Sequence, residues 1–341
     1  MPRPGALLSA RRRAVVGLTA GGAAFVLLAG CTVEPPTPAP EPPVVAAVVS
    51  AAQERKILDR VSGVVEAADD ATKADSLAAR LSGPALLMRQ AELKAAAARG
   101  DDDGLTDLTM QMQQVILPSD QGWPRTSYAI AMQPEDGRVP VLTVFEQPTA
   151  REQYKLWGFV QLLRGVTMPR FAEAELGSAT VAADDKSLKV SPQAAVEQYA
   201  SVLTVDERSK YADSVADDEL RQDLRESGEN QIAAIEKEDG EGSFEVAYEP
   251  TKDPVKAVRT ADGGAVVLAA LLSQETLEAE EGWRLTPLAP SAKALWGDAE
   301  GTDVMKVAYR DMVALYVPPA GSEDQISLLG FHRVPYAVSN G

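Results

Sequence analysis

The chain has 341 residues, of which 50 are acidic and 33 are basic, so the net charge is −17. A chain this negative repels nucleic acid, and no basic stripe with interleaved aromatic residues is present, so we expect no nucleic-acid partner. A single cysteine excludes internal disulfides and zinc sites built from several thiolates. Aromatic residues make up only 5% of the chain, which predicts a core of mainly alanine, valine and leucine.

The N-terminus has the pattern of an export signal followed by a lipid-attachment site. Four arginines and no acid precede an apolar stretch over residues 14–30. Leu28-Ala29-Gly30-Cys31 resembles the lipobox of bacterial lipoproteins, in which signal peptidase II cleaves before a lipid-modified cysteine. This resemblance implies that residues 1–30 are a signal peptide and that acylated Cys31 holds the protein on the outer face of the cell membrane. An uncleaved transmembrane helix is the alternative, and Arg12-Arg13 also resembles a twin-arginine export signal.

A proline-rich segment follows the cysteine. Residues 31–43 contain six prolines. This composition favours extended polyproline II at about 3.1 Å per residue, so twelve residues reach about 37 Å. We expect a semi-rigid tether, and a proline-rich recognition motif is the alternative. Cleavage after residue 30 removes four arginines and no acid, which brings the net charge from −17 to about −21.

Helices precede strands in each half of the remaining chain, which is long enough for two domains. Apolar periodicity predicts the helices, and β-branched and aromatic residues predict the strands. In the first half, the predicted helices cover 44–66, 76–81 and 84–98, and the strands cover 114–117, 126–133, 139–146 and 154–163. In the second half, the helices cover 191–203, 207–215 and 218–237, and the strands cover 243–248, 255–260, 265–274, 305–317 and 326–334.

Helices followed by strands, twice, predict an α+β fold of two tandem domains. Helices packed on a curved antiparallel sheet resemble the cystatin-like or NTF2-like fold, a resemblance that rests on element order and length. The boundary is expected in the loose stretch 173–189, where the periodicity breaks, which gives domains over 44–187 and 188–341. The lipobox, the alanine-rich acidic body, and the segments Leu81–Leu86 and Trp123-Pro124-Arg125 also resemble uncharacterised lipoproteins of actinobacterial envelopes, a family from which no activity can be transferred.

No set of residues predicts catalysis, a metal site or a cofactor. The one histidine, His332, lies in an expected strand on the same face as Ile326, Leu328 and Val334, which favours a half-buried structural residue over a catalytic one. No nucleophile elbow, phosphate-binding loop or dinucleotide-binding turn follows a predicted strand. The acidic run Asp101-Asp102-Asp103 lacks the spacing of an EF-hand, so weak calcium binding is only an alternative to a solvated surface.

Aromatic residues are the candidates for a ligand pocket, because cystatin-like sheets often leave a cone between sheet and helices. Ordinary core packing is the competing explanation. The candidates are Trp123, Tyr128, Tyr154 and Trp157 in the first half and Trp283, Trp296, Tyr309 and Tyr316 in the second.

Together these features predict a non-enzymatic lipoprotein of the cell envelope that acts as a membrane-tethered binding or scaffold module. Its expected partners are membrane lipid, through Cys31, and an envelope protein or cell-wall component. Two alternatives remain open. One is a solute-binding lipoprotein of a transporter, whose two lobes would alternate strands and helices. The other is a wall hydrolase that uses paired carboxylates.

Overall fold

The computed structural model describes residues 46–108, 112–131 and 139–341, and residues 44–341 form one compact unit. The predicted signal peptide, the lipobox Leu28-Ala29-Gly30, the lipidation site Cys31 and the tether all lie outside the described residues. Among the described residues, no helix is both long enough and apolar enough to cross a bilayer.

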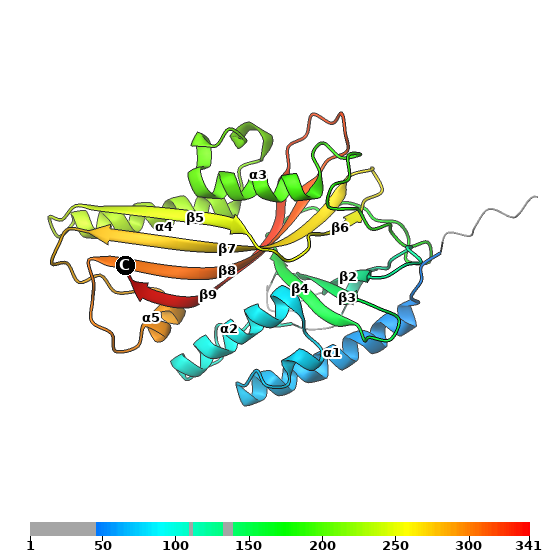
Figure 1. Ribbon diagram of the computed structural model, residues 1–341, viewed down its shortest axis with the longest axis horizontal. Coiled ribbons are helices and arrows are strands. Elements are labelled where there is room, and N and C mark those ends of the chain that lie inside the picture. The colour runs from blue at the N-terminus through cyan, green and yellow to red at the C-terminus, as the bar shows by residue number, and fades with distance from the viewer. Residues whose placement is uncertain (1–45, 109–111, 132–138) are drawn as a thin grey trace, which may run out of the picture. The chain divides into compact units, whose positions relative to one another are not determined.

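One antiparallel sheet of nine strands runs through this unit (Figure 1). The strand order is β1-β2-β3-β4-β9-β8-β7-β5, and β6 pairs with the same edge of β7 as β5 does. The sheet is open, with β1 and β5 at its ends. The strands are β1 (Met112–Ile116), β2 (Arg125–Ala131), β3 (Val141–Gln147), β4 (Lys155–Leu162), β5 (Gly242–Pro250), β6 (Lys256–Arg259), β7 (Ala265–Ala279), β8 (Val304–Val317) and β9 (Ser327–Asn340).

The predicted fold class of two tandem cystatin- or NTF2-like domains is wrong. β4 pairs with β9 through Gln161 with Phe331 and Leu162 with Gly330, which joins the strands of both halves in one sheet. Gly330 permits this approach, since a Cβ there would lie 2.4 Å from the Gln161 carbonyl oxygen. Element order cannot reveal such a pairing, because most neighbouring strands are consecutive in sequence and this pair is not.

Helices cover both faces of the sheet (Figure 1). The helix α1 begins with a capping box between Ser50 and Gln53, and it buries Leu58, Val61 and Val65 at helical spacing. The predicted helices are confirmed, although 76–81 is one 3-10 turn and 207–215 is two, and one seven-residue helix was not predicted. The α-helices are α1 (Ala51–Ala71), α2 (Gly83–Arg99), α3 (Pro192–Val205), α4 (Glu219–Glu236) and α5 (Pro290–Trp296).

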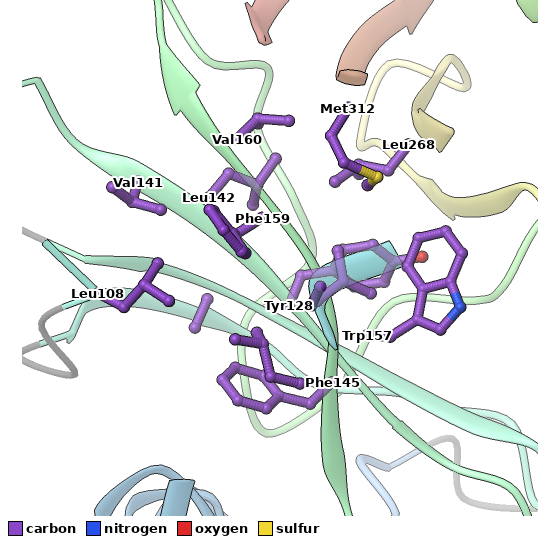
Figure 2. Close-up of a cluster of buried hydrophobic side chains, with 14 of the residues drawn as sticks. Leu108, Tyr128, Val141, Leu142, Phe145, Trp157, Phe159, Val160, Leu268 and Met312 are labelled. Atoms are coloured by element: carbon purple, nitrogen blue, oxygen red, sulfur yellow. The ribbon is translucent and has the colours of Figure 1, made fainter. Parts of the chain in front are cut away.

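The strands β7 and β8 are buried on both faces over residues 265–271 and 311–315. On one face, Leu268 and Met312 pack into a core with α1, α2 and the first four strands, and Figure 2 shows them near Phe159 and Trp157. The residue that follows Leu268, Ala269, belongs to a second core with α3 and α4. Burial on both faces explains why Ala265–Leu271 is continuously apolar rather than alternating.

Candidate functional site

An open cavity of about 690 Å³ lies where the start of α2 meets the ends of β3 and β4. We call it the Trp157 cavity. A parallel bridge between Leu81 and Leu156 brings the segment before α2 against the start of β4. In this bridge, the Leu156 N–H donates to the Arg80 carbonyl oxygen at 2.8 Å, and the Ser82 N–H donates to the Leu156 carbonyl oxygen at 2.9 Å. The lining residues are Ala79, Arg80, Ser82, Gly83, Glu146, Pro148, Arg151, Glu152, Gln153, Lys155, Trp157 and Pro254.

The three lining cations of this cavity, Arg80, Arg151 and Lys155, lack carboxylate partners among the described residues. Arg80 and Arg151 make no ion pair with any described residue, and Lys155 Nζ donates only to the Ala78 carbonyl oxygen, at 2.6 Å. Of the two lining acids, Glu146 pairs with the buried Lys256 and Glu152 makes no ion pair. With Lys256 included, four cations face two carboxylates, an excess of two positive charges in a chain whose net charge is −17.

The Trp157 indole closes the inner wall of the cavity. Its side chain is 3% exposed, and Lys256 Nζ lies 5.3 Å from the ring centroid. Burial lowers the pKa of Lys256 to about 8, which still leaves the ammonium charged at neutral pH. Gly83 has a φ of +51°, and a Cβ there would lie 2.9 Å from Trp157 Nε1. The indole N–H has no acceptor among the described residues. The first residue of α2, Gly83, and the Trp157 indole N–H therefore lie at the same wall of the cavity.

A second cavity, of about 820 Å³, lies between α3, α4 and β5, and we call it the α4 cavity. Two of its three lining arginines, Arg221 and Arg225, are paired with carboxylates, whereas Arg208 makes no ion pair with a described residue. Arg221 Nη2 lies 2.5 Å from Asp206 Oδ1, and Arg225 lies 3.0 Å from both Asp206 and Asp217. Burial alone would raise the pKa of Asp206, but hydrogen bonds from the two arginines lower it below its ordinary value. These groups satisfy one another and hold α4 against the end of α3.

The buried arginine of α2, Arg89, belongs to an ion cluster in the first core. It pairs with Asp69 of α1, and its Nη1 lies 2.6 Å from Glu92 Oε2. Glu92 Oε1 lies 2.8 Å from His332 Nε2. Burial alone would raise the pKa of Glu92, but the hydrogen bond and charge of His332 and the charge of Arg89 lower it to about 2. The cluster ties α1, α2 and β9 together.

His332 is half-buried in β9, as predicted. Of the three residues expected on the same face of the strand, only Val334 lies there. The register of β8 and β9 shifts between Ala314 and Leu315, and this bulge moves the residues before it to the opposite face. Val334 therefore packs in the core of His332, whereas Ile326 and Leu328 pack in the core under α3. The ring centroid of Phe159 lies 5.1 Å from that of His332.

Another buried cluster surrounds Arg333 of β9. Its Nη1 lies 2.7 Å from Glu275 Oε1 and its Nε lies 3.1 Å from Asp311 Oδ1. The guanidinium also lies 3.6 Å from the centroid of the Tyr309 ring, whose hydroxyl donates to Glu275 at 3.1 Å. Burial raises the pKa of Asp311 to about 6. Both carboxylates hold the same guanidinium instead of facing each other across a cleft, so the geometry does not favour the hydrolase alternative.

Unlike the buried acids of the two ion clusters, Glu54 of α1 makes no ion pair with a described residue. It is 0% exposed, its Oε1 accepts from Ser127 Oγ at 2.8 Å, and its Oε2 has no described partner. Burial raises its pKa to about 7. Among the described residues, no group of three or more His, Cys, Asp or Glu side chains is placed to hold a metal ion.

Residues 45–334 match the model of the family described as "Domain of unknown function (DUF8094)". The chain belongs to this family. A protein of Streptomyces avermitilis named "Uncharacterized lipoprotein" is 28% identical over 291 residues, which cover 82% of each chain. No solved structure matches the chain.

In this DUF8094 chain, the eight predicted aromatic residues do not gather in one pocket. Trp157 lines the cavity named after it, and Tyr309 lines a separate cavity of about 260 Å³ under α4. The other six lie elsewhere: Tyr128 and Tyr154 in the first core, Trp296 buried with its N–H donated to the Ala299 carbonyl oxygen, Trp283 against the core of Leu277, Tyr316 hydrogen-bonded to Asp262, and Trp123 44% exposed.

The cations of the Trp157 cavity were missed from the sequence. Arg151 and Lys155 are close in the chain, and their local excess of positive charge in an acidic protein was a weak signal. Nothing in the sequence placed Arg80 beside them, because the bridge between Leu81 and Leu156 joins segments about 75 residues apart.

Proposed function

We propose that the protein is a lipid-anchored module of the cell envelope that binds a ligand or partner outside the cytoplasm. The anchoring part rests on the lipobox pattern that ends at Cys31 and on the name of the Streptomyces avermitilis relative, an uncharacterised lipoprotein. The predicted export signal and the proline-rich residues 31–43 support the same placement.

The binding part rests on one observation: the Trp157 cavity holds cations that no described carboxylate neutralises. Arginines that stabilise a fold have carboxylate partners, as Arg221 and Arg225 of the α4 cavity do. Unpaired cations around an open, concave and partly aromatic wall are typical of a ligand site. A nine-stranded antiparallel sheet does not favour the solute-binding alternative, which would alternate strands and helices in two lobes.

The anchor is tested by labelling cells with an alkyne analogue of palmitate. The wild-type protein should be labelled and should sediment with membranes, whereas Cys31→Ser should be unlabelled. Because Cys31 is the only cysteine, no second thiol can take the label. Mass spectrometry that finds an unmodified thiol, or a chain that still begins at Met1, would contradict the anchor.

The binding role is tested by affinity capture from detergent-solubilised envelopes. We expect wild-type protein and the control Arg164→Gln to retain the same ligand or partner, since Arg164 is exposed and lies outside the cavity. The double variant R80Q/R151Q should lose it. Identical capture by all three proteins would count against this cavity as the binding site.

A further inference from the structure

We propose that the Trp157 cavity binds the phosphate group of a phosphorylated ligand through Arg80, Arg151 and the wall formed by Gly83 and Trp157. This inference rests on the proposed function in taking the cavity as the ligand site, and it adds the chemical class of the ligand. Three independent features of the cavity point to phosphate.

The first feature is charge. The excess of two positive charges matches a dianionic phosphate monoester better than a single carboxylate. Arginine presents a planar fork of donors that can bind two phosphate oxygens at once. Neither Arg80 nor Arg151 makes an ion pair with a described carboxylate. In a chain with 50 acidic residues, two arginines at one cavity without an acidic partner are available for an external anion.

The second feature is the Trp157 indole N–H, a donor at the cavity wall that has no acceptor among the described residues. The residue as a whole is 3% exposed. An acceptor oxygen placed against this wall would take a hydrogen bond from the indole N–H. Gly83 is required here, since a Cβ at this position would lie 2.9 Å from the indole nitrogen.

The third feature is the start of α2. Gly83 is its first residue, so the Gly83 N–H has no partner within the helix. Ser82, the N-cap residue, makes no side-chain hydrogen bond to the first turn. The positive end of the helix dipole therefore faces the wall that also carries the indole N–H and adds to the attraction of an anion.

The size of the cavity indicates what carries the phosphate. About 690 Å³ is more than a phosphate needs, and Trp157, Pro148 and Pro254 offer apolar surface beside the cations. We therefore expect a phosphate attached to an apolar or planar group to bind more tightly than inorganic phosphate. The phosphate monoester belongs to a soluble ligand or to a monoester lipid headgroup near the anchor, and either one presents the same dianion to the cavity.

The test is calorimetric titration of the purified full-length mature protein in a non-ionic detergent at low ionic strength, with inorganic phosphate, phenyl phosphate and benzoate. We expect phenyl phosphate to bind most tightly and benzoate most weakly. R80Q and R151Q should each weaken phenyl phosphate binding about tenfold, as expected for loss of one charge-assisted hydrogen bond. R164Q should leave it unchanged, and added salt should weaken binding to the wild type.

Absence of binding by either phosphate probe would overturn the proposal, as would equal affinities for the double variant R80Q/R151Q and the R164Q control. Micelles doped with phosphatidic acid, whose headgroup is a phosphate monoester, compared with phosphatidylcholine, identify the source. Competition with phenyl phosphate by phosphatidic acid would support a headgroup, and lack of competition would support a soluble ligand. Because the titration is done in detergent, it does not depend on membrane attachment. Its failure is therefore distinguishable from failure of the anchor.

Discussion

The α4 cavity and the Trp157 cavity are both open and both contain arginines, but two of the three arginines of the α4 cavity have carboxylate partners and neither arginine of the Trp157 cavity has one among the described residues. In the α4 cavity, Arg221 and Arg225 share Asp206. In the Trp157 cavity, Arg80 and Arg151 face no described carboxylate. A paired arginine stabilises the fold and has few donors left for a ligand, whereas an unpaired, solvated arginine contributes little to stability and is available for binding. Stability and affinity should therefore respond to different substitutions.

Among the arginines with carboxylate partners, Arg333→Met is the substitution that should lower the free energy of unfolding most. This change leaves Asp311 and Glu275 buried without their counter-charge, and breaking a buried ion cluster from one side costs about 3–5 kcal/mol. Urea unfolding at pH 8 should show this loss. The loss should be smaller at pH 5, because the pKa of Asp311, already raised to about 6, rises further without Arg333 and the acid then binds a proton. A loss below about 1 kcal/mol at pH 8 would contradict the structural role of the cluster.

Glu54→Gln extends the comparison. Like Arg80 and Arg151, Glu54 has no ion pair with a described residue, but it is buried, whereas the two arginines line an open cavity. Its folded-state pKa of about 7 lies above the ordinary value of 4.5, so its contribution to stability is complete below pH 4.5 and is lost as the pH rises through 7. Two and a half pKa units correspond to about 3 kcal/mol in full. Relative to the wild type, the variant should gain roughly 2 kcal/mol between pH 5 and pH 8. A difference that does not change with pH would exclude this role.

Arg221→Gln should have a moderate effect. The side chain is 7% exposed, but its partner Asp206 is 31% exposed and keeps Arg225. We expect a loss of about 1–2 kcal/mol, less than for a fully buried pair. Thermal unfolding of this variant and of Arg225→Gln provides the comparison, and Arg225→Gln should lose less because it is more exposed. Equal losses would mean that burial does not set the size of the effect.

The smallest effect on stability is expected in the Trp157 cavity. R80Q and R151Q should each change the free energy of unfolding by less than about 0.5 kcal/mol, because neither arginine has an ion pair to lose. These are the same variants that should weaken phosphate binding. A loss of stability as large as that of Arg221→Gln would remove the contrast between the two cavities.

Much of the fold was predictable wherever a signal was local. The nine strands and the helices α1 to α4 follow from the periodicity of apolar residues and from turn residues between them. The helix α5 has only seven residues, too few to show a helical period. The burial of His332 was predictable from its strand, but its face was not, because the bulge near Leu328 reverses the alternation.

The candidate site was not predictable in the same way. Trp157 was named from its residue type, but the cations that surround it come from three segments. Arg80 precedes α2, Arg151 lies in the connection between β3 and β4, and Lys256 begins β6. No pattern in the sequence joins them, since each segment looks like an ordinary solvated surface until its neighbours are known.

By itself, the sequence determined the acidic charge, the lipobox pattern at Cys31 and the local conformation of nearly every segment, because these properties depend on a residue and its near neighbours in the chain. Only the tertiary structure decided that β9 pairs with β4 and that Arg80 lies beside Lys155. Such contacts join residues far apart in sequence, and their energies come from packing and desolvation that no single segment contains.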